Sequence, residues 1–345
     1  MSVPTRSAGL VLALAILLLA VLSSLAVGAR SIPVADVADG LLHGGNSQDA
    51  AIVRSIRVPR TVLGVVVGAA LGIAGALMQA LTRNPLADPG LLGVNAGASA
   101  AIVLALSFGV AGAAGSVWFA LLGAALASVA VYVIGSAGRG GATPVRLALA
   151  GTALTAALTA LIYGVALTDS RLLQQFNFWS VGALGGRGRT DLDGILPFVG
   201  VGVVLALVLA RPLNALALGD DSARALGTRV GRTRVSGAGA ITLLCGGATA
   251  AAGPMYFIGL VVPHAGRAVC GPDQRWVLAY SAVLGAALML VADVVGRVLV
   301  RPGELPAGVM LAVIGAPVFI AIVRRKRITE LCWRPTRRRA GSQDG

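Results

Sequence analysis

The chain has 345 residues, of which 57% are hydrophobic and only 12% are charged, and its mean hydropathy is +0.86. A soluble domain usually carries about 25% charged residues, because its surface must face water. The composition therefore excludes an ordinary water-soluble globule and indicates a protein surrounded by lipid. The net charge of +14 must then lie mainly in loops and tails.

The apolar runs are long and continuous, without the alternating pattern of transmembrane β-strands, so they predict membrane-spanning helices. In chain order the expected spans are 9–29, 61–82, 92–108, 113–135, 146–168, 193–210, 235–252, 255–270, 277–297 and 306–323. The first span exceeds the apolar length of a secretory signal, about 7–15 residues, and we expect it to remain as a helix. The third and eighth spans are short, so we expect them to be tilted, broken or partly re-entrant. The predicted fold is all-α: a single polytopic transmembrane domain over residues 1–345.

Glycines repeat on one face of the second span, at Gly64, Gly68, Gly72 and Gly75. Small residues at this spacing let helices approach closely, which is how helices pack in lipid. These glycines predict a compact bundle and not a substrate site.

Arginine and lysine counts predict the orientation, because positive charge is retained on the cytoplasmic side of a membrane. With a cytoplasmic N-terminus and ten spans, 19 of the 28 basic residues fall inside and nine fall outside. The opposite orientation would place the larger set outside. We therefore expect both termini in the cytoplasm.

A basic tail follows the last span, over residues 324–345, and begins with the run RRKR at 324–327. Such a run could bind nucleic acid. In a membrane protein, contact with anionic lipid headgroups accounts for it more simply. We expect membrane lipid, and no nucleic acid, as its partner.

Two connections predicted to be cytoplasmic have defined local shapes. The prolines at Pro85 and Pro89 prevent a continuous helix after the second span and predict a fixed turn. The connection 211–234 predicts a short polar helix, which begins at Asp220 after Gly219 and ends before Gly227. A short helix outside the membrane suits a groove on a partner, although an ordinary solvated loop is the alternative.

Asp293 lies inside the ninth span, where an ionisable side chain is costly unless it faces the bundle interior or water. Arg297 follows one helical turn later, so the two side chains can form an ion pair. A structural intramembrane pair is the favoured interpretation, and a proton relay is the alternative.

Sequence signals of catalysis are missing. The chain has no G-x-x-x-x-G-K-[ST] phosphate-binding loop. Its three cysteines and two histidines show neither paired spacing nor clustering, so neither a metal site nor a cofactor is expected. We therefore predict that the chain is not an enzyme, and that any ATP hydrolysis belongs to a separate subunit.

Several motifs then agree in order and spacing with one family. The chain reads RVPR at 57–60, NPLADPGLLGVNAGAS at 84–99, LALGDDSARALG at 216–227, GPMYFIGLVVPHAGR at 253–267 and RPGEL at 301–305. Together these motifs resemble the FecCD family, the permeases of ATP-binding-cassette (ABC) importers for iron–siderophore complexes and vitamin B12. The resemblance runs from about residue 57 to residue 323 and is strongest to ferric-enterobactin-type permeases.

The resemblance also implies site residues. It implies docking of an extracytoplasmic binding protein on Arg57, Arg60 and Arg297, for which headgroup anchoring is the alternative. A cytoplasmic gate, for which a plain turn is the alternative, is implied at Asn84, Pro85, Leu86 and Thr143. Coupling to the ATPase is implied at Leu218, Gly219, Asp220, Ala223, Leu226 and Gly227.

The implied assembly has two permeases, two ATP-binding subunits and a siderophore-binding protein, in the cytoplasmic (inner) membrane of a bacterium. A hetero pair of permeases is preferred to a homodimer. The expected cargo is a ferric siderophore of the enterobactin type. Import of cobalamin or haem is the first alternative, and a proton-coupled secondary transporter, supported only by Asp293, is the second.

Overall fold

The computed structural model describes residues 3–28, 32–42, 47–110, 116–137, 144–301 and 303–331. Within these ranges, seven helices are long and apolar enough to cross a membrane, and three apolar helices are shorter. The long ones are α1 (Val3–Ala26), α4 (Val58–Thr82), α6 (Ser116–Ser136), α7 (Pro144–Ala166), α9 (Arg189–Leu216), α11 (Val230–Ala252) and α13 (Gln274–Leu299). The shorter ones are α5 (Val94–Ser107), α12 (Ile258–Cys270) and α14 (Ala307–Leu331), of which the apolar part is Ala307–Ala321. Each predicted span overlaps one of these helices, so the predicted all-α polytopic fold is confirmed.

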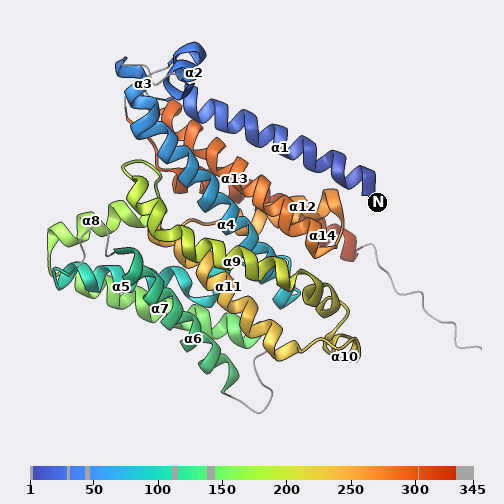
Figure 1. The fold of residues 1–345 in the computed structure, drawn as a ribbon. Coiled ribbons are helices and arrows are strands. Elements are labelled where there is room, and N and C mark those ends of the chain that lie inside the picture. The colour runs from blue at the N-terminus through green and yellow to red at the C-terminus, as the bar shows by residue number, and fades with distance from the viewer. Residues whose placement is uncertain are drawn as a thin grey trace, which may run out of the picture.

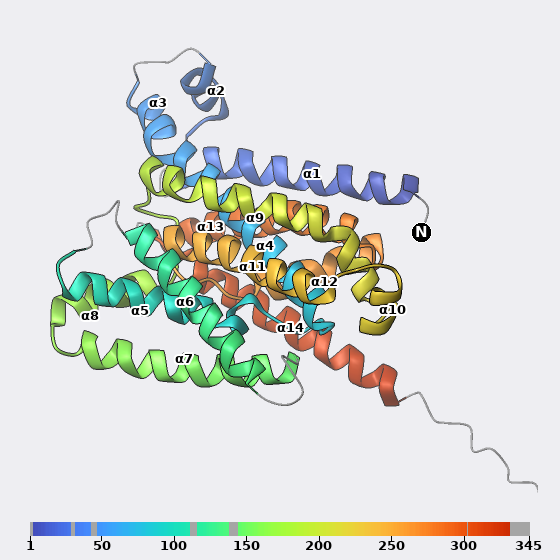
Figure 2. The same ribbon diagram turned by 60° about the horizontal axis from the view of Figure 1, so that its bottom comes forward.

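Short helices connect the long ones, and several of them were not predicted from the sequence. Helices α2 (Val34–Leu42) and α3 (Gln48–Ile52), followed by the π-helical turn η1 (Val53–Arg57), form a protrusion at one end of the bundle (Figures 1 and 2). Helix α8 (Ser170–Ser180) is amphipathic: Leu172, Phe176 and Trp179 share its buried face. The 3₁₀ turn η2 (Pro89–Leu92) precedes α5, and α10 (Asp220–Ala225) lies at the opposite end from α2 (Figure 1).

Two predicted segments have other boundaries in the structure. Helix α9 continues to Leu216 through Pro212, and α11 already begins at Val230. The outer parts of the predicted connection 211–234 therefore belong to the two helices. The helix α14 extends to Leu331, so the first part of the predicted basic tail is helical, and residues 332–345 lie outside the described part of the chain.

Helix α4 lies at the centre of the bundle and contacts α13, α11, α12 and α9 (Figure 1). Its small residues make these contacts close, as the glycine pattern predicted. A Cβ atom on Gly68 would lie 2.5 Å from the carbonyl oxygen of Gly285, and one on Gly75 would lie 2.0 Å from that of Gly259. Only glycine fits at such positions, since the neighbouring backbone occupies the space of a side chain.

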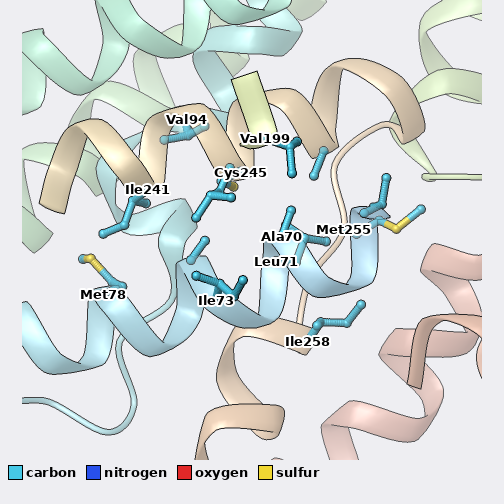
Figure 3. Close-up of a cluster of buried hydrophobic side chains, with 14 of the residues drawn as sticks. Ala70, Leu71, Ile73, Met78, Val94, Val199, Ile241, Cys245, Met255 and Ile258 are labelled. Carbon is cyan, nitrogen blue, oxygen red and sulfur yellow. The ribbon is translucent and has the colours of Figure 1, made fainter. Parts of the chain in front are cut away.

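The apolar core surrounds the middle of α4. Leu71 and Ile73 of α4 lie close to Cys245 and Ile241 of α11, with Met255 of the following connection nearby (Figure 3). All five side chains are at least nine-tenths buried. The core thus positions α11 against α4 and leaves the two ends of α4 to carry polar groups.

Candidate functional site

The two ends of α4 carry the charged residues that the sequence singled out. Arg60 lies near its first residue and Arg83 directly follows its last one. A helix of 25 residues is about 37 Å long. The structure therefore separates the predicted polar sites into one cluster at each end of the bundle, with a cavity beside them.

At the first end, Asp293 of α13 binds two arginines. Nη2 of Arg60 donates to Oδ1 of Asp293 at 2.8 Å and Nε of Arg60 donates to Oδ2 at 3.0 Å. Nη2 of Arg297 lies 3.1 Å from Oδ2. The predicted pair of Asp293 and Arg297 is thus present, and the bidentate contact with Arg60 was not predicted.

The remaining guanidinium donors of this end bind helix α1 and the connection before α14. Arg60 donates from Nη1 to Glu304 at 2.8 Å. Arg297 donates to the carbonyl and the hydroxyl oxygen of Ser24, at 3.1 and 2.9 Å. Arg57 donates to the carbonyl oxygens of Leu25 and Ala26, at 2.6 and 2.8 Å. Carbonyls in the last turn of a helix have no partner within it, so the arginines satisfy the end of α1. We call Arg57, Arg60, Arg297 and Asp293 the arginine cluster.

The arginine cluster faces into the protein. Arg57, Arg60 and Arg297 are only 6%, 8% and 2% exposed. Their gathering at one end agrees with the expected positions. Their docking role stays a prediction, and the contacts of these guanidinium groups join α1, α4 and α13 within the chain.

A cavity of about 500 Å³ opens beside α5, α7 and α8. Its polar lining includes Asp88, Asn95, Thr155, Thr159, Tyr163 and Tyr256, and Phe176 of α8 contributes an aromatic wall. Thr249 donates to Oδ1 of Asn95 at 2.8 Å, which fixes that amide in the bundle. Of the three aromatic residues of α8, Phe176 and Trp179 are buried and Phe178 is exposed.

The turn between α4 and η2 forms one edge of this cavity. Oδ1 of Asn84 accepts a hydrogen bond from the N–H of Leu86 at 3.0 Å, and Leu86 reaches the cavity lining. Asp88 accepts from the N–H of Gly90 at 2.8 Å; burial raises the pKa of Asp88, and this hydrogen bond opposes the rise. Among the predicted gate residues, Leu86 is at the cavity, Asn84 and Pro85 shape the turn, and Thr143 lies outside the described residues. The gate role stays a prediction.

At the other end of α4 lies the predicted short helix, α10. Gly219 and Gly227 flank it with φ angles of +105° and +79°, a backbone region that favours glycine. Asp220 forms ion pairs with Arg83, after α4, and with Arg234 of α11, the latter at 2.9 Å. These two pairs attach α10 to the ends of two core helices.

The apolar residues of this segment point in opposite directions. Ala223 is fully buried against the bundle, whereas Leu218 and Leu226 are 66% and 64% exposed. Exposed leucines on either side of a short helix outside the bundle are suited to a groove on another protein. We call residues 218–227 the coupling segment, after its predicted role.

Comparison with known proteins gives the family of the chain. The model of the FecCD transport family matches residues 16–325. The chain belongs to this family. It is 50% identical over 314 residues to the ferric enterobactin transport system permease protein of Escherichia coli (strain K12), a match that covers 91% of this chain and 94% of that one. It is 41% identical over 311 residues to a siderophore transport system permease protein of Bacillus subtilis (strain 168), covering 90% and 93%.

A solved structure supports the same assignment. An inward-facing metal-chelate type ABC transporter has a TM-score of 0.80 and 25% identity, and the match covers 94% of this chain and 100% of that one. This FecCD chain is thus a multi-pass permease of the ABC-importer type.

Some residues of these sites could not be found from the sequence. Ser24 and Arg83 lie in no family motif, and their partners are 273 and 137 residues away in the chain. Glu304 lies in the RPGEL motif, but its partner Arg60 is 244 residues away, so the motif could not indicate the contact. The i,i+4 spacing revealed only the contact within α13. Asn95 does lie in the family motif at 84–99, and that was the available signal.

Proposed function

We propose that this permease carries a ferric siderophore of the enterobactin type across the cytoplasmic (inner) membrane of a bacterium. The observation that carries the proposal is the 50% identity to a ferric enterobactin permease along almost the whole of both chains. The cavity beside α5, α7 and α8 supports it, since it offers hydroxyl, amide and aromatic groups and little fixed charge. Such a lining suits a bulky chelate that must pass without being held tightly.

The proposed assembly contains a second, different permease, two ATP-binding subunits and a siderophore-binding protein. The coupling segment would contact an ATP-binding subunit, because Leu218 and Leu226 are exposed there. The end of the arginine cluster would meet the binding protein, with both termini of the permease in the cytoplasm. Direct contact through Arg57, Arg60 and Arg297 would require the cluster to open, since their donors are already bound inside the chain.

The cargo is tested by uptake of radiolabelled ferric enterobactin in cells that lack this permease. Restoration of uptake by the wild-type chain, in the presence of an uncoupler but not after ATP depletion, is the expected result. Restoration of labelled haem or cobalamin uptake instead would replace the proposed cargo and keep the importer. Loss of uptake with the uncoupler alone would favour a proton-coupled transporter.

The coupling role is tested with Leu226→Asp. Its side chain is exposed, so the substitution leaves the fold intact, but a buried carboxylate at the contact with a partner is costly. We expect co-purification of the ATP-binding subunit to fall at least tenfold and uptake to be lost. Leu167→Asp is the matched control: that leucine is 70% exposed just after α7, and its substitution should preserve co-purification. Equal co-purification of the two variants would refute the coupling assignment.

A further inference from the structure

An apolar groove and a basic groove meet on the outer face of α11. Helices α9 and α6 both pack on α11 but hardly contact each other (Figures 1 and 2). Residues of α11 line both grooves, and we call the two grooves together the channel, with α11 as its floor. The apolar groove, of about 440 Å³, is lined by Val129 and Tyr132 of α6, Leu205 of α9, and Gly239 and Leu243 of α11. The basic groove, of about 480 Å³, is lined by Arg211, Arg229 and Arg232. Ser236 lines both, so the two grooves adjoin on α11.

The residues of α11 in these grooves form one stripe. Arg229, Arg232, Ser236, Gly239 and Leu243 follow one another at intervals of three and four residues, which places them on one face of the helix. The stripe changes from basic to apolar along its length. A phospholipid has the same order, since its charged headgroup lies at the membrane surface and its acyl chain lies inside.

No carboxylate of the described residues neutralises the arginines of the basic groove. Asp220 pairs with Arg83 and Arg234, and Asp221 pairs with Arg224. Among the described residues, no carboxylate forms an ion pair with Arg211, Arg229 or Arg232, and no group accepts a hydrogen bond from their side chains. Three uncompensated guanidinium groups in one groove favour a phosphate, which accepts several such hydrogen bonds.

The dimensions of the groove fit the apolar part of that molecule. From Arg232 to Leu243 the helix rises about 16 Å, at about 1.5 Å per residue. Half of a hydrocarbon core is about 15 Å thick. The floor is open in the middle: a Cβ atom on Gly239 would meet no other atom within 4 Å.

We propose that this channel is a binding site for one anionic phospholipid. Its phosphate lies between Arg211, Arg229 and Arg232, and one acyl chain lies along Ser236, Gly239 and Leu243 between α6 and α9. The headgroup then sits directly beside Gly227, at the end of the coupling segment. The lipid would stabilise the first turns of α11, which directly follow the coupling segment in the chain.

The site is tested on the full-length permease purified in detergent with its partner subunits. Native mass spectrometry measures the lipid retained after incubation with phosphatidylglycerol or with phosphatidylcholine of the same acyl chains. The wild-type protein should retain one phosphatidylglycerol in preference to phosphatidylcholine. Equal retention of the two lipids would overturn the proposal.

Two pairs of variants locate the site. Gly239→Leu places a side chain in the apolar groove, at a position where a Cβ atom meets no neighbouring atom within 4 Å, and should abolish the preference. Gly200→Leu, on exposed α9 with equally open space, should keep it. Arg232→Gln should weaken phosphatidylglycerol retention about fivefold, as expected for one arginine near an anionic headgroup, whereas Arg275→Gln at an exposed position of α13 should not. If Gly239→Leu and Gly200→Leu retain the lipid alike, the channel does not bind it.

Discussion

The two ends of α4 use the same chemistry in opposite surroundings. In the arginine cluster, the side chains of Arg297 and Asp293 are 2% and 1% exposed. At the coupling segment, those of Arg83 and Asp220 are 40% and 25% exposed. A buried ion pair is costly to break, because each group alone would keep its charge away from water, whereas a pair open to water contributes little. The first end therefore fixes helices to one another, and the second attaches a segment that can be moved.

The largest expected effect comes from Asp293→Asn. This change removes the negative charge that faces Arg60 and Arg297, and we expect it to lower the free energy of unfolding by about 3–5 kcal/mol. Thermal unfolding of the purified permease in detergent measures the change. Asp193→Asn is the control, since Asp193 is 60% exposed and lies 3.8 Å from Arg189, and it should cost less than about 1 kcal/mol. Equal losses in the two variants would show that the buried cluster does not fix the helices.

A smaller loss is expected from Gly75→Ala, between the two ends. The added methyl group would meet the backbone of Gly259 at 2.0 Å, and such overpacking costs about 1–3 kcal/mol. Gly164→Ala on α7 has open space around it and should leave the unfolding temperature unchanged or raise it slightly. If both variants unfold like the wild type, α4 and α12 can separate more freely than the structure indicates.

The smallest effect on stability is expected from Asp220→Asn. It weakens the pairs with Arg83 and Arg234, which are partly open to water, so the loss should be at most about 1 kcal/mol. Transport should respond more strongly, because the coupling segment loses its attachment to α4 and α11. Comparing siderophore uptake with thermal unfolding of the same variant separates the two effects. If Asp220→Asn lowered the free energy of unfolding as much as Asp293→Asn does, the two ends would not differ in this way.

The sequence predicted the helices better than the contacts between them. Seven of the ten predicted spans correspond to helices in the described part of the chain that are long and apolar enough to cross a membrane, and apolar runs of that length are visible in a sequence. Helix α8 was not predicted, because one of its faces is polar and its buried face has only three side chains. In α10, by contrast, the glycines and the aspartates at its start are local signals, and both the helix and its flanking turns were predicted.

The arginine cluster shows why contacts are harder to predict. Asp293 and Arg297 are one turn apart, and spacing alone revealed the pair. Arg60 binds the same carboxylate from 233 residues away, which no local pattern could indicate. The family motif contains both Arg57 and Arg60, but it could not show that their side chains face inward.

The backbone contacts of α4 limit how the transporter can move. A Cβ atom on either Gly68 or Gly285 would meet the carbonyl oxygen of the other, and one on Gly72 would meet that of Ser281 even more closely. Sliding α4 along α13 by one residue would drive a larger side chain into this contact, so the two helices must travel as one rigid body. Helices α5, α6 and α7 reach that body mainly through α11. The hinge for opening and closing the pathway is therefore expected along α11, and the pair of α4 and α13 should keep its internal distances throughout the transport cycle.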